Sequence, residues 1–189
     1  MGLKADMNDI RYVALLRGIN VGKAKRIAMA ELRQLFEEMG FTRVRTILNS
    51  GNVVFDGPAR EAPALSATLE SAIRERFGFP AAVVVLSAAE LTAAIAANPL
   101  MPVREPSKFL VAFGQSADAF EAAVPLTLRN WEPDAFAIVG KAAYLDCFGG
   151  ILESKLVLEF AKATRQGTTT RNWSTVLKLA AVASKNDGR

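Results

Sequence analysis

The chain of 189 residues contains no histidine and only one cysteine, Cys147. Without histidine, Ser-His-Asp triads, Cys-His pairs, histidine-ligated metals and imidazole proton shuttles are all excluded. With one cysteine, an internal disulfide and a metal site built from a cysteine cluster are excluded as well. We therefore expect no metal site, and no motif in the sequence indicates a cofactor.

Long apolar runs are also missing. No stretch is long enough to span a bilayer, and residues 1–10 lack the apolar core of a signal peptide. We therefore expect a cytoplasmic protein with no membrane partner. The 51% of hydrophobic residues is typical of a folded globule, and the net charge of +4 favours phosphate-bearing partners only mildly.

The spacing of apolar and turn residues predicts the same order of elements in both halves of the chain. In the first half, the expected strands and helices cover residues 12–16, 29–39, 44–48, 53–55, 65–77 and 82–86, followed by a helix with a capping box at Ser87 to Glu90. In the second half, they cover 108–113, 116–124, 135–139, 142–148, a helix through Leu152, Leu156 and Phe160, a strand near Thr168 and a helix over 173–183. The order β-α-β-β-α-β predicts an α+β protein of two ferredoxin-like (α/β plait) subdomains with a C-terminal helix.

Proline residues separate these two halves. We predict a first subdomain with its connecting helix over residues 11–97, a proline-rich linker over 98–106, and a second subdomain with the terminal helix over 107–185. In the strand expected over 108–113, Phe109, Val111 and Phe113 share one face while Leu110 and Ala112 share the other, so both faces are apolar and helices on one side cannot account for all the burial. The far face is expected to pack on the other subdomain or on a second subunit.

A basic, glycine-bearing loop from Arg17 to Arg26 follows the first expected strand and precedes a helix, where proteins commonly hold anions. It is not a Walker A loop, because only three residues separate Gly18 from Gly22 and Ala24 follows Lys23. Its two interpretations are anion capture by the loop, or a solvated basic turn in which the glycines serve the backbone.

The turn Asn49-Ser50-Gly51-Asn52 joins the second and third expected strands. In a plait, the first strand ends at the same sheet edge as this turn, so polar residues from both segments should converge there. The candidate ligand-binding residues at this edge are Arg17, Asn20, Lys23, Asn49, Ser50 and Asn52. Turn formation alone also accounts for the hairpin residues.

A third polar cluster, Thr170, Arg171 and Asn172, precedes the terminal helix. One interpretation is structural, with Thr170 or Asn172 capping the helix and Trp173 anchoring it to the core. The other is an anion clamp in which Arg171 supplies a bidentate grip. Cys147 is expected to be a small core residue.

Three segments together resemble one known family. They are residues 12–22 (YVALLRGINVG), 49–55 (NSGNVVF) and 169–176 (TTRNWSTV). In this order they are similar to the bacterial family called domain of unknown function 1697, over most of the chain from Arg11 to about Ala180. The resemblance implies two ferredoxin-like subdomains and implies no established activity.

The leading hypothesis is binding of a small anionic ligand or nucleotide, through phosphate or carboxylate, at the basic polar edge. A nucleic-acid-binding module is an alternative, although residues 52–55 offer one aromatic, Phe55, where RNA-recognition strands present several. A structural protein that dimerises through a sheet face is another. Whether the chain is an enzyme, and whether it is a monomer or a homodimer, stay open.

Overall fold

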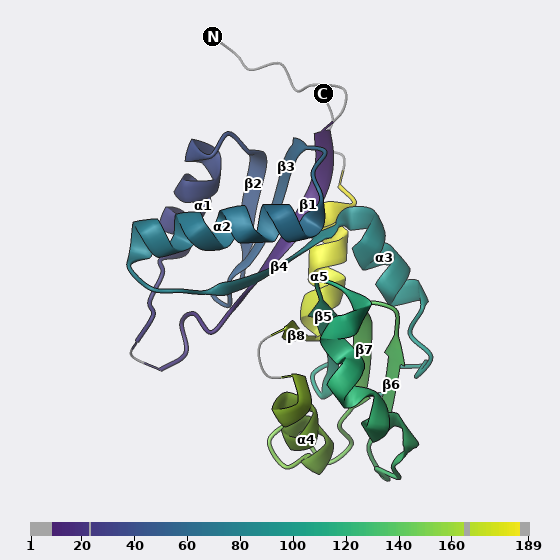
Figure 1. Ribbon diagram of the computed structural model, residues 1–189. Coiled ribbons are helices and arrows are strands. Elements are labelled where there is room, and N and C mark those ends of the chain that lie inside the picture. Colours follow the sequence, from purple (N-terminus) through teal and green to yellow (C-terminus); the bar gives the residue numbers. More distant parts are fainter. Residues whose placement is uncertain (1–8, 23, 165–166, 186–189) are drawn as a thin grey trace. The chain divides into compact units, whose positions relative to one another are not determined.

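The computed structural model describes residues 9–22, 24–164 and 167–185 (Figure 1). The chain forms two compact units, one containing the residues up to Leu91 and those from Leu179 onward, the other Thr92–Lys178. The helices α3 (Ala88–Ala96) and α5 (Trp173–Ala183) each cross a boundary between the units. The ranges 11–97, 98–106 and 107–185 stay a prediction from the sequence.

The first unit is built on an antiparallel sheet of four strands in the order β2-β3-β1-β4. Its elements are β1 (Asp9–Arg17), α1 (Met29–Glu38), β2 (Thr42–Ile47), β3 (Asn52–Pro58), α2 (Ala62–Phe77) and β4 (Ala82–Ser87). The expected capping box opens α3, since the Ser87 amide donates to Glu90 and the Glu90 amide donates to the Ser87 hydroxyl. The predicted order of elements is confirmed for this half.

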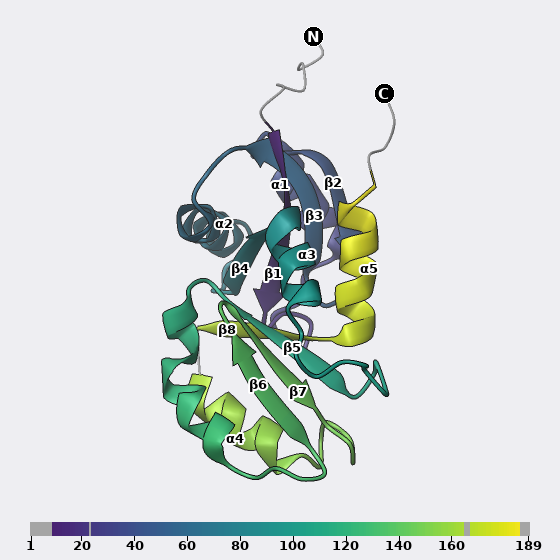
Figure 2. The same ribbon diagram turned by 90° about the vertical axis from the view of Figure 1, so that its right-hand side faces the viewer.

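The core of the first unit lies between the sheet and the helices α1 and α2, which pack on one of its faces. Figure 2 shows α2 to the left of the sheet, on this side. Alternate residues of β1 and β3 enter this layer, as the period of a strand requires. Phe55 lies at its centre, with the rings of Tyr12, Phe36 and Phe41 packed around it at 4.7–5.6 Å between centroids.

A buried ion cluster ties the strands of the first unit together. The Asp56 carboxylate, on β3, accepts hydrogen bonds from Arg11 on β1 and Arg43 on β2. Arg11 also donates to the backbone carbonyls of Val182 and Lys185 at the end of α5. The Asp56 carboxylate therefore binds two arginines, and one of them, Arg11, also binds the C-terminal turn of α5.

The second unit repeats the plan with a sheet in the order β6-β7-β5-β8. Its elements are β5 (Phe109–Gly114), the 3₁₀ helix η1 (Ala117–Leu128), β6 (Ala135–Val139), β7 (Ala142–Asp146), α4 (Lys155–Thr164) and β8 (Thr168–Asn172). Two antiparallel sheets with interleaved helices and a C-terminal helix confirm the predicted α+β fold.

Two helices of the second half differ from the prediction. The segment expected as an α-helix over 116–124 is a 3₁₀ helix that extends to Leu128, and Pro125 inside it has no N–H to donate to an α-helical ladder. The helix expected through Leu152 begins at Lys155, because Ser154 accepts the Val157 amide as its N-cap. Leu152 therefore precedes the helix and is 95% exposed.

The face of β5 that carries Phe109, Val111 and Phe113 is covered in part from within its own unit. The Trp173 ring, at the start of α5, packs edge-on against Phe109 at 5.5 Å. The Tyr144 hydroxyl donates to the Ala94 carbonyl of α3 at 2.6 Å, and burial raises the pKa of this phenol to about 12.

Among the helices of the described ranges, none combines the length and the apolar character needed to span a membrane.

Candidate functional site

The loop after β1 is held together by the Asn20 carboxamide. Its Nδ2 donates to the Ile27 carbonyl at 3.0 Å and its Oδ1 accepts the Ile27 amide at 2.9 Å, so the side chain pairs with both backbone polar groups of one residue, as a residue of a neighbouring strand would. The backbone amide of Asn20 also donates to Lys25 at 3.0 Å. Asn20 and Lys25 both adopt the left-handed conformation, which asparagine tolerates better than most residues. These hydrogen bonds therefore close the loop by joining Asn20 to Lys25 and Ile27.

The same side chain joins this loop to the hairpin between β2 and β3. Asn20 Nδ2 donates a second bond, of 2.9 Å, to the Asn49 carbonyl, and the Leu16 amide donates to the Gly51 carbonyl at 2.8 Å. The predicted convergence of the loop and the hairpin at one sheet edge is thus present in the structure for Asn20 and Asn49. Arg17 ends β1 at this edge, opposite Ala82 of β4.

The hairpin residues Ser50, Gly51 and Asn52 are explained by packing and turn geometry. Gly51 has a φ of +74°, and a Cβ there would lie 2.7 Å from side-chain atoms of both Leu16 and Ile19. Asn52 is fully buried and donates to the Ile47 carbonyl and the Ser50 hydroxyl. These contacts place Ser50 and Asn52 as supports of the hairpin.

A hollow of about 480 Å³ opens between the loop and the hairpin, at the start of α1. It is lined by Asn20, Arg26, Ile27, Ala28, Met29 and Asn49. The first N–H groups of a helix have no acceptor within the helix, and Ala28 at the N-cap offers only a methyl group. The hollow therefore adjoins the N-terminus of α1, Arg26 and the two asparagines Asn20 and Asn49. Lys23, predicted for this site, lies outside the described residues.

The cluster Thr170, Arg171 and Asn172 lies in the second unit, on β8. Asn172 Oδ1 accepts both the Thr175 amide at 2.9 Å and the Thr175 hydroxyl at 2.7 Å, which confirms its role as the cap of α5. Arg171 donates to the Thr169 hydroxyl and the Thr170 carbonyl, and burial lowers the pKa of its guanidinium to about 10. Thr170 itself is exposed.

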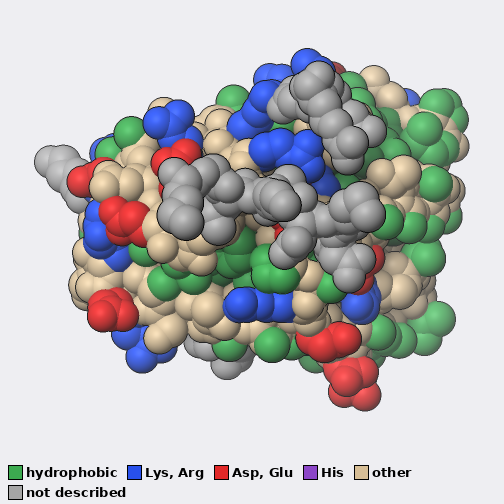
Figure 3. All heavy atoms as spheres, turned by 90° about the horizontal axis from the view of Figure 1, so that it is seen from above, with side chains coloured by type: hydrophobic (Ala, Val, Ile, Leu, Met, Phe, Trp, Pro, Cys, Tyr) green, Lys and Arg blue, Asp and Glu red, His purple; other side chains and the backbone are tan. Residues whose placement is uncertain are grey.

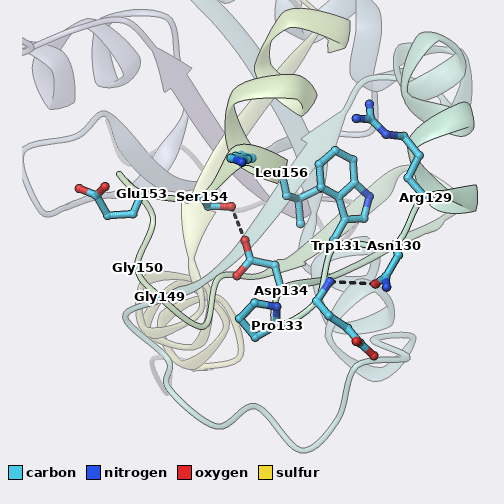
Figure 4. A pocket seen from close by; sticks show the side chains of 12 residues that line it. Arg129, Asn130, Trp131, Pro133, Asp134, Gly149, Gly150, Glu153, Ser154 and Leu156 are labelled. Atoms are coloured by element: carbon cyan, nitrogen blue, oxygen red, sulfur yellow. Dashed lines mark hydrogen bonds between the residues drawn. The ribbon is translucent and has the colours of Figure 1, made fainter.

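Sequence reasoning missed a second hollow, of about 450 Å³, in the second unit (Figure 4). The Arg129 guanidinium lies over the Trp131 ring at 4.5 Å, on the rim. On the opposite wall Asp134 accepts the Ser154 hydroxyl at 2.6 Å and the Phe148 amide at 2.9 Å. In the sequence, the run Arg129-Asn130-Trp131 could have indicated this hollow. However, it has neither the helix start nor the glycine spacing that mark an anion loop.

Cys147 is buried in the core of the second unit, as predicted. Burial raises the pKa of its thiol to about 11. Since the thiolate is the reacting form, we expect Cys147 to react with a disulfide reagent at pH 8 about a hundredfold more slowly in the folded protein than in denaturant. Equal rates in the two states would contradict this burial.

The face shown in Figure 3 carries both Lys and Arg side chains and Asp and Glu side chains. The described part of the chain does not bring three Asp, Glu or Cys side chains together as a metal site.

Comparison with known proteins places the chain in a family. A family model described as a protein of unknown function (DUF1697) matches residues 10–144, and the chain belongs to that family. Its fold is similar to that of the conserved bacterial protein SP0830 from Streptococcus pneumoniae, with a TM-score of 0.74 and 22% identity over 93% of this chain and 99% of that one. None of the curated proteins compared with the chain matches it.

Proposed function

We propose that this member of the DUF1697 family binds a small ligand through a phosphate or carboxylate group at the start of α1. The observation that supports the proposal is the hollow at the helix N-terminus, with Arg26 on its rim and a methyl group at the N-cap position. A ligand oxyanion would supply the acceptors that the first turn of α1 lacks.

Two fields act on an anion at this position. The N-terminus of the ten-residue helix α1 carries the positive end of the helix dipole. Its first N–H groups point along the helix axis, away from the helix and toward the position of the anion. Arg26 adds a planar guanidinium that can donate two parallel hydrogen bonds to a phosphate or carboxylate. Glu31, in the first turn, opposes both fields and limits the affinity.

The remaining lining indicates the size and the character of the ligand. Ile27, Ala28 and Met29 give one side of the hollow an apolar surface, and its volume lies in the range of pockets for small molecules. A nucleotide or a sugar phosphate fits this combination better than a free inorganic ion does. Asn20 acts as the positioning residue, because its carboxamide is engaged in holding the loop closed.

The test is a titration of the full chain with inorganic phosphate and with a nucleoside diphosphate, followed by calorimetry or thermal shift. We expect Arg26→Ala to weaken binding about tenfold, as loss of a charge-assisted pair does. Glu31→Gln should tighten binding about two- to fivefold, because it removes a negative charge from the first helical turn.

Arg129→Ala is the matched control, since it removes an exposed arginine from the rim of the other hollow. It should leave the affinity for phosphate unchanged. Equal affinities in the wild type and Arg26→Ala, or loss of binding in Arg129→Ala alone, would contradict a site at α1.

A further inference from the structure

The edge strand β6 of the second sheet is unusually open to pairing. Its five residues, Ala135–Val139, contain no charged side chain and no proline, and their register with β7 runs without a bulge. β6 lies at the end of the strand order, with β7 as its one neighbour in the described sheet. A strand of this kind is a template for another strand, and proteins usually block it with charges, proline or a bulge.

The other three sheet edges carry such devices. Edge strand β2 has Arg43 and Arg45 and an irregular register between Thr42 and Arg45. On β4, the Val83 amide is bound by the Glu70 carboxylate at 2.9 Å. On β8, Arg171 lies within the strand. Of the edges that the described residues form, β6 is therefore the one left without a blocking feature.

The turn between β6 and β7 tells which backbone groups point outward. Val139 faces Ala142 across the two-residue turn Gly140-Lys141, and Gly140 has a φ of +56°. In a two-residue hairpin the flanking pair exchanges hydrogen bonds, and the pattern then alternates along the ladder. Residues 135, 137 and 139 thus bond to β7, whereas the N–H and C=O groups of Phe136 and Ile138 point away from it.

We propose that a second copy of this chain pairs with β6 along this edge, antiparallel and symmetric about Ala137. In this register Phe136 of each copy faces Ile138 of the other, and the outward groups of these residues form about four backbone hydrogen bonds. Both side chains pack on the core face of the sheet, so the pairing extends an existing apolar layer. The two sheets of the second units become one continuous sheet.

The charges that flank β6 favour a second copy in this orientation. Glu132 and Asp134 precede the strand and Lys141 follows it. Antiparallel pairing about Ala137 brings the acidic end of each strand beside the basic end of the other, twice in the symmetric dimer. A parallel arrangement would place like charges together, which is unfavourable.

The first measurement is the mass of the full chain in solution by light scattering or sedimentation, over a wide range of protein concentration. A monomer–dimer equilibrium is expected, and a monomer at every concentration would overturn the proposal. Amide hydrogen exchange identifies the interface: protection of Phe136 and Ile138 should rise with concentration, while that of residues 135, 137 and 139 stays constant. A dimer whose concentration-dependent protection lies elsewhere would also overturn it.

The second measurement uses the flanking charges. Lys141→Glu should raise the dimer dissociation constant about tenfold, because the symmetric dimer contains the resulting like-charge contact twice. The double variant Glu132→Lys with Lys141→Glu exchanges the signs and should restore dimerisation. Circular dichroism confirms that each variant is folded. A single variant that dimerises like the wild type, or a double variant that stays weakened, would contradict the proposed pairing.

Discussion

Asp56→Ala is expected to lower the free energy of unfolding by about 3 to 5 kcal/mol, as removal of one partner from a buried ion pair does. The Asp56 side chain is 2% exposed and bonds to Arg11 and Arg43. Its loss leaves the Arg11 guanidinium, whose side chain is 13% exposed, without its anionic partner. Chemical denaturation followed by circular dichroism measures the effect.

Arg43→Ala serves as the comparison, because it removes the exposed partner of the same carboxylate. The Arg43 side chain is 46% exposed, so we expect a loss of about 1 kcal/mol or less. If Asp56→Ala does not fold, Asp56→Asn replaces it in the comparison. Asparagine keeps a hydrogen-bond acceptor, so we expect its loss of free energy of unfolding to lie between those of Asp56→Ala and Arg43→Ala. Equal losses of free energy of unfolding in the Asp56→Ala and Arg43→Ala variants would contradict the claim that burial of the carboxylate makes its removal more costly.

Asn20→Asp is expected to have the largest effect on ligand binding. The substitution removes the Nδ2 donor and places a carboxylate against the carbonyls of Ile27 and Asn49, which Asn20 binds at 3.0 and 2.9 Å. The loop should open, at a cost of about 1 to 3 kcal/mol for the acceptors left without a donor. Binding of phosphate should fall to the detection limit, as measured by the same titration as for Arg26→Ala.

Asn49→Ala distinguishes the hydrogen bond that holds the loop to the hairpin from the side chains that line the hollow. Asn20 bonds to the backbone carbonyl of Asn49, so alanine at position 49 leaves this contact in place. We expect the stability of this variant to stay close to that of the wild type. A loss of stability as large as that of Asn20→Asp would mean that the Asn49 side chain, and not only its backbone carbonyl, holds the loop to the hairpin.

Much of the fold could be predicted from the sequence because local signals and periodicity agree. Ser87 and Glu90 form the reciprocal cap that their spacing predicts, and Gly78 ends α2 in the left-handed conformation. The plait topology also predicted that Asn20 and Asn49 come together, although they are separated by 29 positions along the chain. A convergence of this kind follows from strand order alone, and needs no knowledge of side-chain contacts.

The roles of the individual residues could not be predicted in the same way. Asn20, Ser50 and Asn52 were predicted as ligand-binding residues, and the structure shows their amide and hydroxyl groups engaged in holding the loop and the hairpin. Their bonds depend on the three-dimensional course of the turn, which spacing does not encode. By contrast, the spacing did place the start of α1 after Ala28, an N-cap residue without a side-chain acceptor.

The hollow beside Trp131 was missed for a related reason. Its two walls, around Arg129 and around Ser154, are brought together by packing of η1, β6 and α4, and no local pattern joins them. The start of α4 was also placed too early, because Leu152 fits the helical period although it precedes the cap at Ser154. Periodicity marks the apolar face of a helix and does not mark its first turn.

The most direct test of the central claim is a phosphate titration of the full chain followed by the backbone amide signals in NMR. If an oxyanion occupies the hollow at α1, the amide signals of Met29, Ala30 and Glu31 should shift in a saturable manner, and Arg26→Ala should weaken this response. Saturable shifts confined to residues 149–156, or no saturable shift in any amide, would contradict an anion site at the start of α1.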